Sequence, residues 1–159
     1  MTTPVCQQCA APIRGLICEY CGSLTQLGTD LATEKQALVE YHNILQNQEP
    51  DRQVQLLLNG FLPDHTAVLI EAGMRCIPLI DTSDPADEKV GAATKRLRAI
   101  VVKLRLLAQN EQAEKAIVEL EAVLNEYKRA DKQLNWIVAG MFLFLGLACV
   151  AVIWLWLIL

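Results

Sequence analysis

The sequence lacks the short motifs that mark most enzyme active sites. It contains no recognisable Ser or Cys nucleophile elbow, no glycine-rich phosphate loop and no His–carboxylate metal motif. Histidine occurs only 2 times in 159 residues, and neither His42 nor His65 has a metal-ligating residue three or four positions further on. We therefore expect a protein that is not an enzyme.

Charge is absent from the last 26 residues, where 23 positions are apolar, although only 53% of the whole chain is apolar. About 20 apolar residues in a helix cross the roughly 30 Å hydrocarbon layer of a bilayer. The pattern predicts a transmembrane helix over 134–159. Trp136 at one end, and Trp154 and Trp156 near the other, are expected to lie at the two membrane interfaces.

Three basic residues, Lys128, Arg129 and Lys132, precede the apolar segment and are expected to contact lipid head groups. By the positive-inside rule, the part of the chain before this segment is cytoplasmic. The N-terminus is polar and rich in cysteine, so it offers no signal peptide. The sequence thus predicts a single-pass, tail-anchored membrane protein, in the inner (plasma) membrane if the source is bacterial.

Four of the 6 cysteines form two Cys-x-x-Cys pairs within the first 21 residues: Cys6, Cys9, Cys18 and Cys21. Two such pairs can supply four thiolates to one tetrahedral ion. A cytoplasmic location disfavours disulfides, and a redox Cys-x-x-Cys normally occurs once, beside a βαβ pattern. An iron–sulfur cluster also uses four cysteines, but the turn with Gly22 favours zinc. We expect one structural Zn²⁺, because the protein fills all four positions.

These motifs resemble the bacterial and archaeal zinc-ribbon class, whose usual form is Cys-x-x-Cys-Gly-Ala, a short connector and Cys-x-x-Cys-Gly. The second half matches as Cys18-Glu19-Tyr20-Cys21-Gly22, whereas the first half has Ala10 where Gly is usual. The resemblance covers residues 1–25. It implies a small β module that binds proteins or nucleic acids, or that holds an N-terminus together.

The middle of the chain predicts short amphipathic helices. A capping box at Thr33 starts one helix, Pro50 and Gly60 bound another, and a third ends at Gly73. The stretch 69–80 is similar to one helix-turn-helix of armadillo-type repeats, but no second copy follows.

A long helix is predicted after Asp84-Pro85, with a break near Gln109-Asn110. Five cations lie within residues 94–107, and acidic residues dominate 111–126, so folding back would pair a basic helix with an acidic one. The last helix would then continue unbroken into the membrane.

The predicted fold is mainly α: an N-terminal zinc ribbon of small β structure, a helical body with a long α-hairpin and a C-terminal transmembrane helix. The predicted domains are a ribbon at 1–25, a linker at 26–32, a cytoplasmic body at 33–133 and the membrane helix at 134–159.

The function predicted from these parts is a non-catalytic, tail-anchored adaptor or scaffold that binds protein partners at the membrane. One alternative is a self-assembling membrane effector or stress protein that perturbs the bilayer, which would make the chain a homo-oligomer. Another is a membrane-tethered zinc ribbon that binds nucleic acid. The charge of residues 1–85, with 4 basic and 10 acidic side chains, disfavours nucleic acid.

Overall fold

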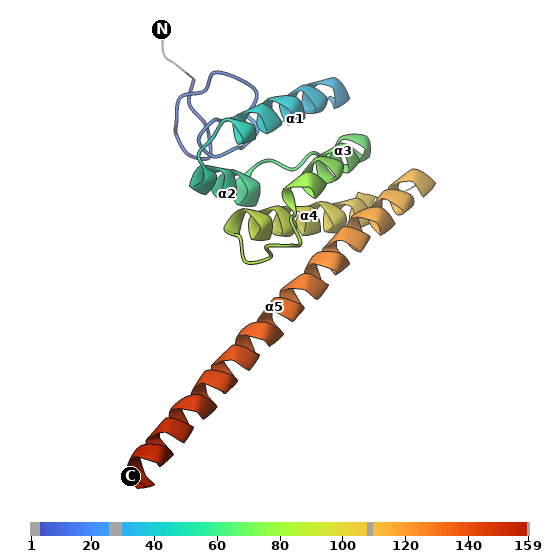
Figure 1. Cartoon of the computed structure of the whole chain (residues 1–159). Coiled ribbons are helices and arrows are strands. Elements are labelled where there is room, and N and C mark those ends of the chain that lie inside the picture. The colour runs from blue at the N-terminus through green and yellow to red at the C-terminus, as the bar shows by residue number, and fades with distance from the viewer. Residues whose placement is uncertain (1–3, 26–29, 108–109, 159) are drawn as a thin grey trace.

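The computed structural model describes residues 4–25, 30–107 and 110–158, with side chains described as far as Met141. A cysteine-rich N-terminal segment is followed by five α-helices and one 3₁₀ helix in this described part. They are α1 (Leu31–Gln46), α2 (Pro50–Asn59), α3 (Thr66–Cys76), η1 (Ile77–Leu79), α4 (Glu88–Leu107) and α5 (Glu111–Ile158). Figure 1 shows α1 to α4 grouped in one body, with α5 starting beside α4 and extending far beyond it.

The ends of α1 and α2 follow from local hydrogen bonding. The side chain of Asp30 accepts the Thr33 N–H at 2.8 Å, so α1 begins at Leu31, before the predicted capping box. The predicted bounds of α2 are confirmed, because Pro50 opens the helix and Gly60 caps it.

The predicted end of α3 at Gly73 is wrong, because the helix continues to Cys76. The stretch that resembles an armadillo turn therefore lies largely inside a helix. Gly73 is needed for packing instead: a Cβ atom there would lie 2.7 Å from Cδ1 of Leu120 on α5. The start of α4 also differs from the prediction, since Asp87 rather than Asp84 accepts the first free backbone N–H groups, those of Lys89 and Val90.

The predicted α-hairpin is present as α4 and α5. Its break lies between Leu107 and Glu111, and the Asn110 side chain accepts the Ala113 N–H at 2.8 Å. Arg105 of the basic helix forms an ion pair with Glu121 of the acidic helix. The fully buried core of the body joins the hairpin to α2 and α3 through leucine, isoleucine and valine side chains: Leu56, Leu57, Val68, Leu69, Leu97, Ile100, Leu104 and Leu120.

The predicted small β structure at the N-terminus is wrong. The described residues contain no strand, only two isolated bridges, Val5 with Pro12 and Ile17 with Leu24. Each bridge closes the loop around one Cys-x-x-Cys pair. The segments that flank each loop pair at one position only, so the turns dominate and no ladder develops.

The predicted C-terminal membrane helix, and the single-pass location that depended on it, are also corrected. Over the part of the chain whose side chains are described, no helix is long and apolar enough to cross a membrane. Charged side chains continue along α5 as far as Lys132, and residues 142–159 of the predicted span lie outside those whose side chains are described.

Four parts of the body meet at Gly60, where α2 ends. The buried Arg96 of α4 donates hydrogen bonds to the backbone carbonyls of Gly60 at 3.3 Å and Phe61 at 2.7 Å. Its guanidinium also lies over the Tyr41 ring, 4.4 Å from the centroid. The Tyr41 hydroxyl in turn donates to the Leu56 carbonyl at 2.7 Å. A buried cation therefore satisfies carbonyls that the end of α2 leaves without helical partners.

Replacing Arg96 by Met is expected to lower the free energy of unfolding by about 3 kcal/mol, because the buried carbonyls lose a charged donor. The matched control is Arg98→Met on the exposed side of α4, which is expected to cost less than about 0.5 kcal/mol. Urea unfolding of the full chain in mild detergent, monitored by circular dichroism, measures the free energy of unfolding of both variants. Equal stability of the two variants would contradict the role given to Arg96.

Candidate metal centre

The four predicted ligands come together at one point. The sulfur atoms of Cys6, Cys9, Cys18 and Cys21 all lie within 4.8 Å of one another, so these cysteines could hold one metal ion. Two of the sulfur–sulfur distances, Cys6 to Cys21 and Cys9 to Cys18, are 3.6 Å. A tetrahedron with metal–sulfur bonds of about 2.3 Å has edges of about 3.8 Å, so the observed spacing fits a single tetrahedral ion.

The two cysteine pairs lie in loops that are structural copies of each other, 12 residues apart. In both loops the first cysteine uses its N–H and its carbonyl in the same two backbone hydrogen bonds. The Cys6 N–H donates to the Ala11 carbonyl, as the Cys18 N–H does to the Ser23 carbonyl. The Ala10 N–H donates to the Cys6 carbonyl, as the Gly22 N–H does to the Cys18 carbonyl. The equivalent residues Ala10 and Gly22 both have positive φ, 60° and 71°. Each loop thus directs two sulfurs to the shared centre.

The thiols resist simultaneous ionisation in the absence of a cation. Burial opposes ionisation of Cys21, but hydrogen bonds from Ser23 outweigh it and lower the pKa of Cys21 to about 7. The Ala11 N–H favours the thiolate of Cys9, yet partial desolvation and the three neighbouring thiols raise the pKa of Cys9 to about 12. Four thiolates this close repel one another, so a bound cation is required to hold all of them in the charged form.

Glu40 on α1 attaches the cysteine-rich segment to the helical body. Its carboxylate accepts the Leu16 N–H at 3.3 Å and the Ile17 N–H at 3.1 Å. The carboxylate lies so close to Gly15 that a Cβ atom there would be 2.1 Å from Glu40 Oε1. The Ile17 side chain is fully buried and belongs to the same hydrophobic core as the helices. The connector between the two cysteine loops is therefore bound to α1.

The second cysteine loop is bound to the end of α2. The Gly22 carbonyl accepts the Phe61 N–H at 2.8 Å, and a Cβ atom at Gly22 would lie 3.0 Å from the Gly60 Cα. Glycine is required here both by this close approach and by its positive φ. The metal centre is thus connected directly to the junction that Arg96 and Tyr41 stabilise.

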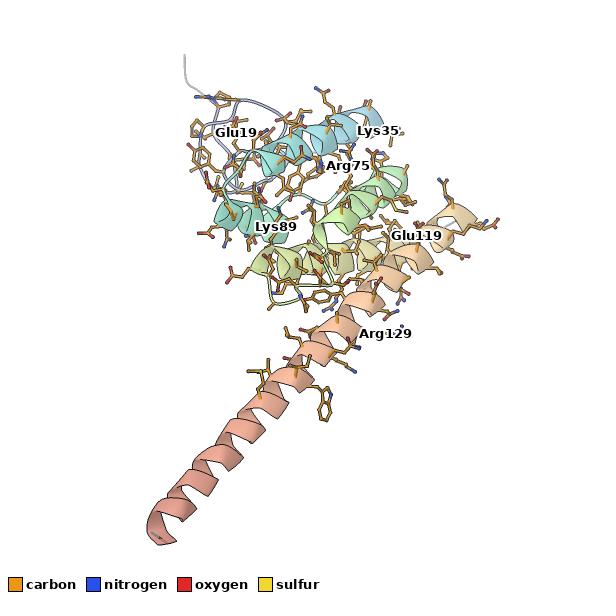
Figure 2. All side chains as sticks on the ribbon, viewed as in Figure 1. Glu19, Lys35, Arg75, Lys89, Glu119 and Arg129 are labelled. Carbon is orange, nitrogen blue, oxygen red and sulfur yellow. The ribbon has the colours of Figure 1, made fainter. Side chains whose placement is uncertain are left out.

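The residues predicted for a membrane interface lie on α5. Lys128, Arg129, Lys132 and Trp136 are exposed, and the Trp136 side chain is 80% exposed. Figure 2 shows Arg129 on the part of α5 that has left the body. Trp154 and Trp156 lie outside the residues whose side chains are described.

Sequence reasoning missed two buried charged residues that join the helices of the body. Arg96 belongs to the basic stretch that was expected to pair with the acidic helix, but it is buried and bonds to α2 instead. Glu34 is also buried, and its carboxylate accepts the N–H groups of Asp64 and His65 at 3.0 Å. Nothing in the sequence signals these tertiary contacts. The 12-residue repeat, in contrast, is visible in the spacing of the cysteines.

Comparison with family models, with curated proteins and with solved structures finds no match for this chain.

The two equivalent positions with positive φ generate a prediction, because one is occupied by Ala and the other by Gly. Ala10→Gly is expected to stabilise the metal-bound protein by about 1 kcal/mol, because Ala carries a Cβ penalty at positive φ. Its structural equivalent is the matched control: Gly22→Ala is expected to destabilise by about 2 kcal/mol or more, since it adds the contact with Gly60 to the same penalty. Thermal unfolding with metal present measures both, and a destabilising Ala10→Gly change would contradict the left-handed turn at Ala10.

Proposed function

We propose that this chain is a non-catalytic adaptor or scaffold whose N-terminal segment is a zinc ribbon. The observation that carries the proposal is the set of four cysteine sulfurs, which lie close enough together to hold one metal ion. A closed Cys₄ site leaves no position for water or substrate, so the ion has a structural role. Zinc is favoured over other ions because it prefers tetrahedral thiolate sites and supports folding without redox chemistry.

The packing around the ribbon supports a role in presenting a surface. The second cysteine loop, α1 and α2 share the junction at Gly60, and the metal therefore orders a platform that includes part of the helical body. Beyond this platform, α5 extends as one continuous helix of 48 residues. We infer that the body binds a protein partner while α5 sets the distance between the body and whatever contacts the C-terminal end.

Nucleic-acid binding by the ribbon has less support. A surface groove beside Cys21 is lined by seven residues, of which only Arg52 is charged: Gln8, Tyr20, Cys21, Ser23, Arg52, Gln55 and Asn59. One cation neutralises at most one phosphate, and tight binding to nucleic acid usually requires several such contacts.

The proposal is tested by purifying the tagged full chain from its native cells in mild detergent and measuring both bound zinc and complex mass. We expect about one zinc per chain and a stoichiometric protein partner. Cys18→Ser is expected to lose both the zinc and the protein partner, because the platform is no longer ordered. Cys76→Ala is the control, since Cys76 is buried between helices away from the cluster. It is expected to keep both.

Two outcomes would contradict the proposal. Folding and zinc-free partner binding by Cys18→Ser would show that the ion does not order the binding surface. A purified wild-type complex that contains nucleic acid in place of protein, and that dissociates as salt is raised, would favour the alternative function.

A further inference from the structure

The two cysteine loops share one backbone pattern, but they differ in the side chain two positions after the second cysteine. In the first loop this position is Ala11, and in the second loop it is Ser23. The Ser23 Oγ lies 3.1 Å from the Cys21 Sγ, so its hydroxyl can donate a hydrogen bond to a thiolate there. The methyl group of Ala11 cannot do this for Cys9. The sulfur cluster is therefore chemically asymmetric, although the backbone is repeated.

This asymmetry affects the reactivity of the second cysteine in each loop. Both cysteines accept a backbone N–H, Cys9 from Ala11 and Cys21 from Ser23. The Ser23 hydroxyl is thus an additional donor that only Cys21 receives from the repeated position. Hydrogen bonds from groups around a metal site tune its ligands, and a donor on a thiolate sulfur withdraws the electron density with which that sulfur attacks. The Cys9 thiolate is therefore the stronger nucleophile of the two.

Exposure separates the same two cysteines. Cys9 is exposed and Cys21 is half-buried, whereas Cys6 and Cys18 are buried. Cys21 also borders the groove beside α2, so a small solute can reach it as well. Oxidation of cysteine depends on thiolate character together with exposure. Both criteria select Cys9 as the sulfur with which an oxidant reacts first.

A short sulfur–sulfur distance connects Cys9 to the other loop. The Cys9 Sγ lies 3.6 Å from the Sγ of the buried Cys18, and the Sγ atoms of Cys6 and Cys21 are separated by the same distance. A disulfide in either pair needs only a small movement of two side chains. Cys18 is therefore placed to attack the Cys9 sulfur once that sulfur is oxidised.

We propose that Cys9 and Cys18 form a redox-modification site, at which a hydroperoxide converts two of the four metal-binding thiolates into a disulfide. The inference rests on the zinc ribbon proposed above, because a bound cation holds these sulfurs in the thiolate form. Cys9 is the sulfur that reacts with the oxidant, and Cys18 is the sulfur that completes the disulfide.

The reaction has two steps. In the first, the Cys9 thiolate attacks an oxygen of the hydroperoxide, so that an S–O bond forms and the O–O bond breaks. Cys9 becomes a sulfenic acid, and the oxygen that leaves takes up one proton to give an alcohol, or water when the oxidant is hydrogen peroxide. In the second, the Cys18 thiolate attacks the Cys9 sulfur and displaces hydroxide, which takes up a second proton to give water. The two sulfurs lose two electrons in total, and these electrons reduce the hydroperoxide.

The modification opens the metal centre on the side that contacts the body. Two sulfur donors remain, those of Cys6 and Cys21, and two thiolates hold an ion much more weakly than four. The Cys18 carbonyl accepts the Gly22 N–H, and the Gly22 carbonyl accepts the Phe61 N–H at the end of α2. The oxidised pair therefore includes the loop on which the platform depends, so hydroperoxide lowers the order of that platform.

Stepwise oxidation tests the order of these events. The reduced, zinc-loaded full chain in mild detergent is treated with increasing hydrogen peroxide, and free thiols are then alkylated. Cleavage after Arg14 separates the two loops, so mass spectrometry of the fragments locates each disulfide. The first disulfide is expected to join Cys9 to Cys18. A chromogenic chelator measures zinc in parallel and is expected to find about one zinc released per Cys9–Cys18 disulfide, and a dithiol reductant is expected to restore zinc binding. Cys76 is the internal control, since it is buried and is expected to stay reduced.

Two variants at the equivalent positions test the cause of the asymmetry without removing a cysteine. Ala11→Ser adds a hydroxyl beside Cys9, and it is expected to slow formation of the first disulfide about fivefold, the effect of one hydrogen bond. Ser23→Ala removes the hydroxyl beside Cys21, and it is expected to raise the share of the Cys6–Cys21 disulfide in the first product. Both variants keep all four sulfur donors, and both are expected to bind zinc before oxidation.

Three results would overturn the inference. They are a first disulfide within one loop or between Cys6 and Cys21, an unchanged rate for Ala11→Ser, and release of zinc by hydrogen peroxide without a disulfide. Zinc content before oxidation separates this inference from the proposed function. A reduced chain without zinc would contradict both, whereas a zinc-loaded chain that hydrogen peroxide leaves fully reduced would contradict the redox site alone.

Discussion

The carbonyl-rich end of α2 at Gly60 is the point on which the rest of the body depends. The carbonyls at the half-buried end of α2 need partners, and here the guanidinium of Arg96 supplies them from α4. Tyr41 from α1 covers the same point, and the Phe61 N–H reaches the cysteine segment at Gly22. Three helices and the cysteine-rich segment are therefore connected through two consecutive residues, Gly60 and Phe61. A cation in this position gives α4 a structural role in addition to its exposed charge.

The charges of α4 consequently divide into two groups with different functions. Arg96 is buried and holds α2, and Lys103 contacts Asp64 and the Leu62 carbonyl at the start of the α3 region. Lys95 and Arg98 face outward beside exposed apolar residues. The same separation occurs on α5, where Glu121 pairs with Arg105 while Glu114 and Glu119 remain outward. The hairpin thus satisfies one set of charges internally and leaves another set exposed.

The sequence predicted the parts of the structure that depend on local chemistry. Pro50 and Gly60 mark α2 because proline and glycine act on their own backbone, and the cysteine spacing located the metal site because thiol geometry is local. It failed at Gly73, which looks like a helix end but makes room for Leu120, a residue 47 positions later in the chain. It also failed for Arg96, whose burial is determined by α1 and α2. The membrane helix was inferred from the apolar composition of 134–159, its Trp residues and the basic residues before it, and the described part of α5 does not provide it.

The central claim is that the metal centre and the helical body form one cooperative unit through the Gly60 junction. Amide hydrogen exchange of the full chain, measured with the proposed zinc ion loaded and after chelation, tests it most directly. The account predicts that chelation removes the protection of the Ile17 and Phe61 amides and lowers protection at the end of α2, while amides in the Ala113–Leu120 part of α5 change much less. Full protection of the Phe61 amide after complete loss of zinc would contradict it, because the cysteine segment would then be ordered independently of the metal or not joined to α2.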